Sequence, residues 1–272
     1  MRSPTLQELP PPPEGKTGWP WTAKSPQLPE TMPDGSPWPR ISIVTPSYNQ
    51  GKFIEETIRS VLLQGYPDLE YIIIDGGSSD ESVAIIKKYA PWLSYWISES
   101  DNGQAHAINK GFSRATGTTI GWLNSDDTYL SGVFRAIAEY FSVHHDRQVV
   151  FGDCHAVDEC GNVISVWKGH FSNRRDLIRW WKRERVTGPI WILQPSVFFS
   201  RDARARTGFL DESLYYVLDY EFWIRLSGVY KFFYIEHTLS TYRLHSTSKS
   251  VTRDEEKQLA ECERVSKRNW GR

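Results

Sequence analysis

The sequence of 272 residues is poor in cysteine, in long apolar runs and in surplus charge. Cys154, Cys160 and Cys262 form no CxxC pair, and their odd number argues against a disulfide framework or a zinc cluster. The 32 basic and 33 acidic side chains give a formal net charge of −1. Since nucleic-acid binding normally requires excess positive charge, we exclude nucleic acid as the main partner.

Membrane spans and export signals are also lacking. No apolar run approaches the roughly 18 residues that a spanning helix needs. The first residues lack the apolar segment of a secretory signal. Together with the few cysteines, this predicts a cytoplasmic protein. We expect an amphipathic helix around Arg179, Trp180 and Trp181, which would contact the acceptor of a reaction or the inner face of a membrane.

The composition divides the chain into three regions. Residues 1–39 are rich in proline, including the run 10–13, which favours polyproline II structure or disorder. This region is either a tail or a segment that wraps over the domain through its aromatic residues, which are Trp19, Trp21 and Trp38. The remaining regions are a domain over 40–250, with halves 40–130 and 131–250, and a charged helix or tail over 251–272.

Alternating strand and helix patterns fill the first half of the domain. Apolar strands are predicted at 41–45, ending at Pro46, and at 71–74, 95–97 and 119–123. Helices are predicted at 54–62, at 104–114, and up to Tyr89 after a capping box of Ser78 and Glu81. Short loops between these elements indicate an α/β fold with a doubly wound, mostly parallel sheet flanked by helices. The second half is less regular, with strands near 148–151, 162–167 and 232–235 and a helix near 220–226.

Polar residues collect where the predicted strands end. In open α/β sheets, ligands bind beyond the carboxyl ends of the strands, so these residues are expected at one rim. They are Thr45, Ser47, Tyr48, Asp75, Asp101, Asp126 and Asp127. Polar loops and helix caps are the simpler explanation for any one of them, but less so for the whole set.

The segment from Asn124 to Asp127 carries the sharpest chemical signal. The adjacent carboxylates of Asp126 and Asp127 repel each other unless a cation or a donor compensates them. A divalent ion held by one or two carboxylates and by substrate phosphates is the usual solution, which predicts Mn²⁺ or Mg²⁺ here. A solvated turn is the alternative.

Four ordered blocks resemble the family 2 glycosyltransferases, which are inverting enzymes of the GT-A nucleotide-diphospho-sugar fold. The similarity extends over about Ile41 to Ser248. The blocks are Ile43–Asn49, Ile74–Asp80, Asp101–Gly111 and Leu123–Asp127.

The resemblance implies roles for individual residues. The nucleotide sugar would be bound by Thr45, Pro46, Ser47, Tyr48, Asp75, Ser78, Asp101, Gly103, Asn124, Ser125 and Asp126. Among these, Asp75 would hydrogen-bond the base, typically uracil, and Asp101 with Gly103 would lie near the ribose and diphosphate. Asp126 and Asp127 would hold the metal and diphosphate, although Asn124 occupies the usual first acidic position of this motif.

The catalytic base and the acceptor side are expected in the second half. Asp219 matches the family's base, although the preceding Glu of the family is Leu218 here; Glu221 is the fallback, and a helix N-cap is the simpler role for Asp219. Gln194 and Trp223 would lie on the acceptor side. His245 would reach the metal or the diphosphate, or else be structural.

The resemblance implies transfer of a sugar from a nucleotide-diphosphate sugar, most simply a UDP-sugar, to a carbohydrate or lipid-linked acceptor in polysaccharide or glycoconjugate synthesis. A catalytically inactive binding module is one alternative. A nucleotidyltransferase is another, but it would need a glycine-rich basic loop after the first strand, where Pro46–Gln50 stands instead. A Rossmann dehydrogenase is disfavoured because Gly76 and Gly77 do not extend into a GxGxxG motif.

Overall fold

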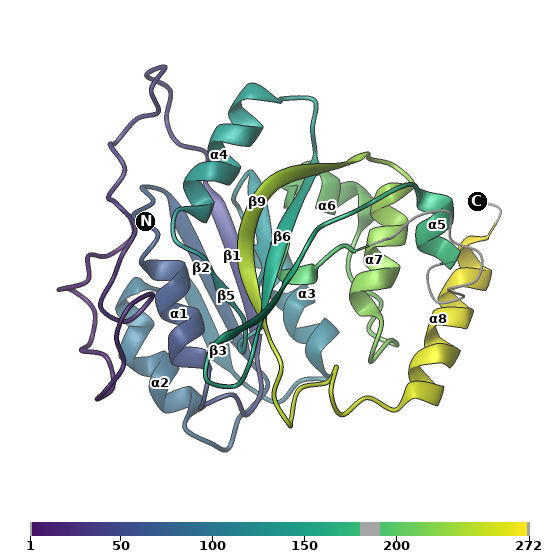
Figure 1. Cartoon of the computed structure of the whole chain (residues 1–272), viewed down its shortest axis with the longest axis horizontal. Coiled ribbons are helices and arrows are strands. Elements are labelled where there is room, and N and C mark those ends of the chain that lie inside the picture. Colours follow the sequence, from purple (N-terminus) through teal and green to yellow (C-terminus); the bar gives the residue numbers. More distant parts are fainter. Residues whose placement is uncertain (1, 180–190, 271–272) are drawn as a thin grey trace.

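The computed structural model describes residues 2–179 and 191–270 and shows a central sheet with helices on both sides (Figure 1). The strands lie in the order β3-β2-β1-β4-β8-β6-β9-β5, and β7 pairs with β6 at the side. This arrangement confirms the predicted α/β fold.

The first half of the domain contains the parallel part of the sheet. Its strands are β1 (Ile41–Ser47), β2 (Leu69–Asp75), β3 (Tyr95–Ser98) and β4 (Thr119–Trp122). All three pairings among these strands are parallel. The connecting helices are α1 (Ile54–Leu62), α2 (Ser82–Tyr89) with the short helix η1 (Ala90–Trp92), and α3 (Gln104–Arg114). The carboxyl ends of these strands therefore meet at one rim, as the alternating pattern predicts.

The second half adds strands that are largely antiparallel to their neighbours. These are β5 (Thr128–Tyr129), β6 (Val149–Val157), β7 (Val163–Trp167), β8 (Val197–Ser200) and β9 (Phe232–Arg243). Among these five strands β6 pairs with β9 in parallel, and the other pairings, including that of β8 with β4, are antiparallel. The helices are α4 (Val133–Val143), α5 (Arg174–Arg179), η3 (Gln194–Ser196), α6 (Arg201–Thr207), α7 (Leu218–Ser227) and α8 (Glu255–Asn269). Figure 1 shows α5, α7 and α8 together at the end of the molecule away from α1 and α2.

Two details of the first half correct the sequence-based expectation. Strand β1 continues through Pro46 to Ser47, because β4 pairs with β1 only as far as Val44 and leaves an open side where the missing N–H is not needed. Helix α2 has no side-chain cap at its N-cap, Glu81. Ser78 instead donates to Asp75 (2.5 Å) and accepts the Asn49 N–H (2.8 Å), so it braces two loops.

The proline-rich N-terminal region wraps over the domain beside α1 (Figure 1). Trp21 and Trp38 are buried, and the indole N–H of Trp19 donates to the carbonyl of Tyr129 at 2.9 Å. Of the two arrangements left open by the sequence, the structure therefore shows the wrapped one. None of the helices within residues 2–179 and 191–270 is long and apolar enough to cross a membrane. The predicted membrane or acceptor contact at Trp180 and Trp181 lies outside the described residues.

A buried arginine of α1 anchors this N-terminal region. The guanidinium of Arg59 donates to the carbonyl oxygens of Pro10 (2.9 Å), Pro20 (3.0 Å) and Trp21 (2.7 Å). It also donates to the hydroxyl of Tyr89 at 3.0 Å. Because a buried guanidinium must satisfy its donors, the carbonyl oxygens of the N-terminal region complete the environment of Arg59.

Replacing Arg59 by leucine should lower the free energy of unfolding by about 3 kcal/mol, since three buried carbonyls would lose their donor. Chemical denaturation measures this loss, and limited proteolysis should show faster cleavage within residues 2–39. The matched control is Arg135→Leu in α4, where the side chain is 57% exposed and pairs with Glu139. Equal stability of the two variants would contradict the anchoring role.

Candidate active site

A cleft of about 790 Å³ opens at the carboxyl ends of the parallel strands, between the two halves of the domain. Most of the residues predicted to bind substrate line it. They are Pro46, Ser47, Tyr48, Asp101, Gly103, Asn124, Ser125, Asp126, Asp127, Gln194, Asp219 and Trp223. The fold thus brings together side chains that come from both halves of the sequence.

Asp126 lines this cleft, and His245, which is buried and is not among the lining residues, contacts it from the segment after β9. The Nε2 atom of His245 lies 3.0 Å from Oδ2 of Asp126, and its Nδ1 atom lies 2.9 Å from the hydroxyl of Thr247. The imidazole is buried and packs against the ring of Phe53 at a centroid distance of 4.5 Å. These contacts fix the ring so that Nε2 faces Asp126.

Asp127 connects the turn after β4 with the end of β9. It is almost completely buried, and its Oδ1 accepts the backbone N–H of Arg243 at 2.9 Å. Burial, and then the neighbouring carboxylate of Asp126, raise the pKa of Asp127 well above its usual value. Arg243 in turn donates from its guanidinium to the backbone carbonyl of Asp126 (2.9 Å) and to Glu56 (2.9 Å).

Asn124 belongs to a chain of hydrogen bonds in which the donor and the acceptor of every bond are determined; we call it the directed chain. Its Oδ1 accepts from the indole N–H of Trp122 (2.9 Å) and from the Gln104 amide (2.9 Å). Its Nδ2 donates to Oε1 of Gln194 (2.9 Å), whose Nε2 donates to the Trp122 carbonyl (2.6 Å). An indole N–H only donates and a carbonyl only accepts, so the orientation of both amides is determined. Asn124 therefore has its Oδ1 and one N–H of its Nδ2 engaged within the protein.

Asp219 lies in the first turn of α7 and lines the same cleft. Its Oδ1 accepts the N–H of Tyr220 at 2.8 Å, while the N-cap position is held by Val217. Oδ2 has no hydrogen-bond partner among the described residues. Burial raises the pKa of Asp219 above its usual value, and the positive charge of Lys249 opposes this only weakly.

Comparison with known proteins assigns this chain to a protein family. The model of the glycosyl transferase family 2 matches residues 42–207, which is more than half of the chain. The chain belongs to glycosyl transferase family 2. It is 26% identical over 218 residues to an uncharacterized glycosyltransferase of Rickettsia prowazekii, covering 79% of this chain and 67% of the relative. It is 29% identical over 218 residues to chondroitin synthase of Escherichia coli, covering 78% of this chain but 30% of that protein.

Solved structures show that the fold of this glycosyltransferase is the GT-A fold. S. aureus TarS 1–349 in complex with UDP-GlcNAc superposes with a TM-score of 0.69 at 17% identity, covering 85% of this chain and 66% of that one. The mannosyltransferase PcManGT of Pyrobaculum calidifontis, in complex with GDP-Man and Mn²⁺, superposes with a TM-score of 0.57 at 19% identity. This match covers 84% of the chain and 62% of that structure, so this chain spans about two thirds of each of these two structures.

Three of the residues expected to bind the nucleotide sugar do not line the cleft, namely Thr45, Asp75 and Ser78. Thr45 is buried and pairs its hydroxyl with that of Tyr71 at 3.2 Å. Asp75 is fully buried, and both of its carboxylate oxygens are used: Oδ1 accepts from the hydroxyls of Ser47 and Ser78, and Oδ2 from Ser98 and two backbone N–H groups. In this structure Asp75, which was expected to bond the base, is buried away from the cleft and organises the loop after β2.

Gly76 and Asp101 occupy the place beside Asp75 that faces the cleft. A Cβ atom on residue 76 would lie 2.7 Å from Oδ2 of Asp101, so the glycine provides the space for this carboxylate. Oδ1 of Asp101 accepts the N–H of Gly103 at 2.7 Å. Oδ2 has no hydrogen-bond partner among the described residues and is available to a ligand.

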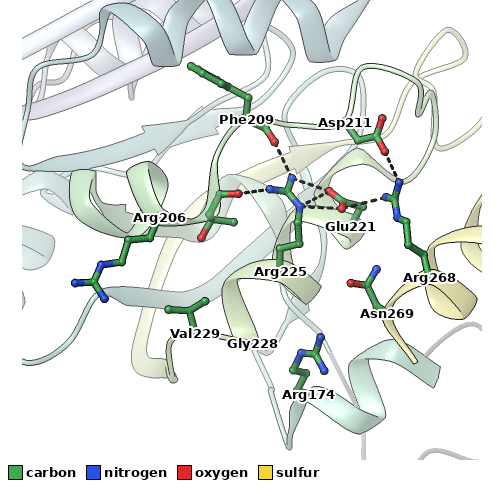
Figure 2. A pocket seen from close by; sticks show the side chains of 11 residues that line it. Arg174, Arg206, Phe209, Asp211, Glu221, Arg225, Gly228, Val229, Arg268 and Asn269 are labelled. Atoms are coloured by element: carbon green, nitrogen blue, oxygen red, sulfur yellow. Dashed lines mark hydrogen bonds and ion pairs between the residues drawn. The ribbon is translucent and has the colours of Figure 1, made fainter. Parts of the chain in front are cut away.

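Glu221, the alternative base of the sequence analysis, lies outside the cleft that Asp219 lines. Figure 2 shows it in a separate pocket, where its carboxylate binds Arg225 (2.7 Å) and Arg268 (3.2 Å). Arg225 also donates to the carbonyl of Phe209 at 2.7 Å. The pairing of Glu221 with Arg225 follows from their i, i+4 spacing on α7, so Glu221 stabilises the helix and its contact with α8.

Aromatic side chains that the sequence did not single out form one wall of the cleft. The ring of Trp167 lies 5.5 Å from that of Tyr242 and 6.4 Å from that of Trp191. Trp191 is 51% exposed. Each of these residues comes from a different segment, so no local pattern could bring them together; the high tryptophan content was the only available signal.

The chemistry of Asp126 and His245 fits a divalent ion. Asp126 and His245 offer an oxygen and a nitrogen 3.0 Å apart, which suits adjacent ligands about 2.1 Å from one octahedral ion. Among residues 2–179 and 191–270, no group of three or more His, Cys, Asp or Glu could hold a metal alone. An imidazole nitrogen suits a transition ion such as Mn²⁺ better than Mg²⁺, which prefers oxygen ligands.

The substitution Asn124→Asp places an acid at the position where the family usually has one. It should lower the free energy of unfolding by about 1–3 kcal/mol. The new carboxylate oxygen would face Oε1 of Gln194, and turning that amide over would oppose its oxygen to the Trp122 carbonyl. Thermal and chemical unfolding without metal measure the loss. Asn102→Asp makes the same change at an exposed position and should be neutral. An Asn124→Asp variant as stable as the parent would contradict the directed chain.

Proposed function

We propose that this glycosyltransferase moves a sugar, with inversion, from a nucleoside-diphosphate sugar to an acceptor hydroxyl. The observation that carries the proposal is one cleft lined both by Asp126, which His245 contacts from behind at 3.0 Å, and by Asp219 with its unpaired carboxylate oxygen. TarS, in complex with UDP and with UDP-GlcNAc, and PcManGT, in complex with GDP-Man and Mn²⁺, support a nucleotide-sugar donor. The higher TM-score of TarS favours a UDP-sugar.

The nucleoside would bind near the carboxyl end of β1. Tyr48 lines the cleft there with 63% of its surface exposed, and its ring offers a face on which a base can stack. Asp101 presents its free Oδ2 in the space left by Gly76 and would accept a hydrogen bond from the base or the ribose. Pro46 and Ser47 line the wall between them.

The diphosphate would lie over Asp126 and His245. A divalent ion held there would offset the negative charge that develops on the departing diphosphate. Asp127 has one oxygen bonded to Arg243 and is almost completely buried, so we assign it to the support of Asp126. The metal ligands we propose are therefore Asp126 and His245, with Mn²⁺ as the best-suited ion.

Asp219 would act as the catalytic base. Its free Oδ2 takes the proton of the acceptor hydroxyl as that oxygen forms a bond to the anomeric carbon. The bond between this carbon and the diphosphate oxygen breaks on the opposite side, and the electron pair stays with the diphosphate. Attack from the side opposite the leaving group inverts the configuration.

The acceptor would bind on the wall formed by Trp167, Trp191 and Tyr242. Aromatic faces suit the C–H groups of a sugar ring, which favours the sugar part of a carbohydrate or lipid-linked acceptor. Trp223 lines the same cleft, and its buried indole N–H has no partner among the described residues. The similarity to chondroitin synthase of E. coli supports a place in polysaccharide or glycoconjugate synthesis.

Asp126→Ala and His245→Ala should each weaken the Mn²⁺-dependent binding of the donor by at least about tenfold. Calorimetric titration with a panel of UDP- and GDP-sugars, in Mn²⁺ and in EDTA, measures this effect. Lys52→Met changes the charge of an exposed residue that does not line the cleft and serves as the control. Donor affinity independent of both Mn²⁺ and these substitutions would contradict the proposed metal site.

Asp219→Asn should lower kcat by about 10²–10⁴-fold while donor binding is retained. The base acts only when deprotonated, and burial raises the pKa of Asp219, so activity of the parent should fall on the acid side with an apparent pKa above that of an ordinary aspartate. A pH profile of kcat/KM for transfer or for donor hydrolysis measures this limb. Normal turnover by Asp219→Asn would exclude the assignment, and tight donor binding without any turnover by the parent would favour an inactive binding module.

A further inference from the structure

A lysine of the loop after β9 extends into the same cleft. The ammonium group of Lys249 donates to Oε1 of Gln104 at 2.8 Å and to the carbonyl of Tyr215 at 3.0 Å. It lies 3.9 Å from the centre of the Tyr215 ring. An ammonium has three N–H groups, so one is left without a partner among the described residues.

The charge of Lys249 is not neutralised by a direct ion pair in the part of the chain that the structure describes. Burial lowers the pKa of Lys249 to about 8, although the more distant charges of Glu261 and Asp219 act in the opposite direction. The group therefore remains largely cationic at neutral pH. A half-buried ammonium without a carboxylate partner is unfavourable, and binding of an anion would relieve this cost.

The other cations of the cleft are less suited to an anionic ligand. The guanidinium of Arg243 is buried and bonded to Asp126, Glu56 and the Glu159 carbonyl. Arg253 is 41% exposed at the edge, 3.8 Å from Glu255. Lys249 thus provides the one amine with both a position inside the cleft and a free donor, among the cations that the structure describes there.

The hydrogen-bond chain described above explains why no carboxylate neutralises this amine. Lys249 bonds Gln104, and the amide of Gln104 bonds Asn124, two residues before Asp126. A lysine only donates, so the chain has the same direction from Lys249 to the Trp122 carbonyl. An acid at position 124 would place a negative charge one side chain away from the amine. With Asn124, the positive charge stays available beside the residues that carry Asp126.

We propose that Lys249 binds the diphosphate of the donor nucleotide and stabilises it as it leaves. This inference rests on the proposed function, since it concerns the same bond between the anomeric carbon and the diphosphate oxygen. When that bond breaks, the electron pair stays on the diphosphate, and the free N–H of Lys249 donates to one of its oxygens. The Asn124–Lys249 combination gives the cleft a cation of its own in addition to any metal.

A purely structural role for Lys249, tying the loop after β9 to α3, predicts a different pattern of affinities. Loss of a tie would disturb the whole nucleotide pocket, so nucleoside and nucleoside diphosphate would both bind more weakly. Loss of a diphosphate contact affects only the ligand that carries the phosphates. Gln104→Leu provides the comparison, because it breaks the tie to α3 and leaves the ammonium in place.

The test is calorimetric titration of the full chain with UDP, uridine, GDP and guanosine, each in Mn²⁺ and in EDTA. Lys249→Met should weaken binding of the nucleoside diphosphate by about 10-fold or more, as expected for a charge-assisted hydrogen bond, and change nucleoside binding by less than about twofold. Lys249→Arg should recover much of the loss. Lys267→Met, an exposed residue of α8 paired with Glu263, should bind as the parent does.

Each contrary result has a distinct meaning. Equal weakening of nucleoside and nucleoside diphosphate in Lys249→Met, reproduced by Gln104→Leu, would overturn the proposal in favour of the structural tie. Unchanged affinity for both ligands would also overturn it, while the glycosyltransferase function would stand on the binding by the parent. Failure of the folded parent to bind either nucleoside diphosphate would overturn the proposed function and this inference together.

Discussion

The arrangement of the cleft depends on the bond between the Asp127 carboxylate and the backbone N–H of Arg243. It joins the turn after β4 to the end of β9, and the guanidinium of Arg243 adds a second link to the backbone of Asp126. Asp126 follows β4 and His245 follows β9, so this junction brings together two residues that are 119 positions apart. A buried carboxylate needs such donors, and the need is met only when the two strands are in this register.

Much of the first half could be predicted from sequence because its signals are local. Continuous apolar strands and 3.6-residue periodicity define β1 to β4 and their helices within a few residues. The second half could not be predicted as well, because its strands pair with strands that are distant in the sequence. Strand β5 has two residues and β8 has four, while β9 extends over twelve, far beyond the apolar segment 232–235 that the sequence indicated. Such strands are defined by their neighbours rather than by their own pattern.

The candidate site, like the fold, could be predicted from the sequence only in part. The resemblance to the family indicated Asp101, Asp126 and Asp219, and all three line the cleft. The sequence could not indicate which carboxylates already have hydrogen-bond or ion-pair partners within the protein. Asp75 accepts five hydrogen bonds and Glu221 pairs with two arginines, and neither fact is visible until the chain is folded. Lys249 stands alone in a segment of serine and threonine, where no spacing distinguishes it.

The central claim is that Asp126 and His245 form an incomplete metal site, which the diphosphate of the donor completes. Titration of Mn²⁺, followed by electron paramagnetic resonance, with and without UDP or GDP, tests it most directly. Two protein ligands alone should bind Mn²⁺ weakly, and a nucleoside diphosphate should tighten the binding by at least about tenfold, an effect abolished in Asp126→Ala. Mn²⁺ affinity that is the same with and without nucleotide, or that survives Asp126→Ala, would contradict the account.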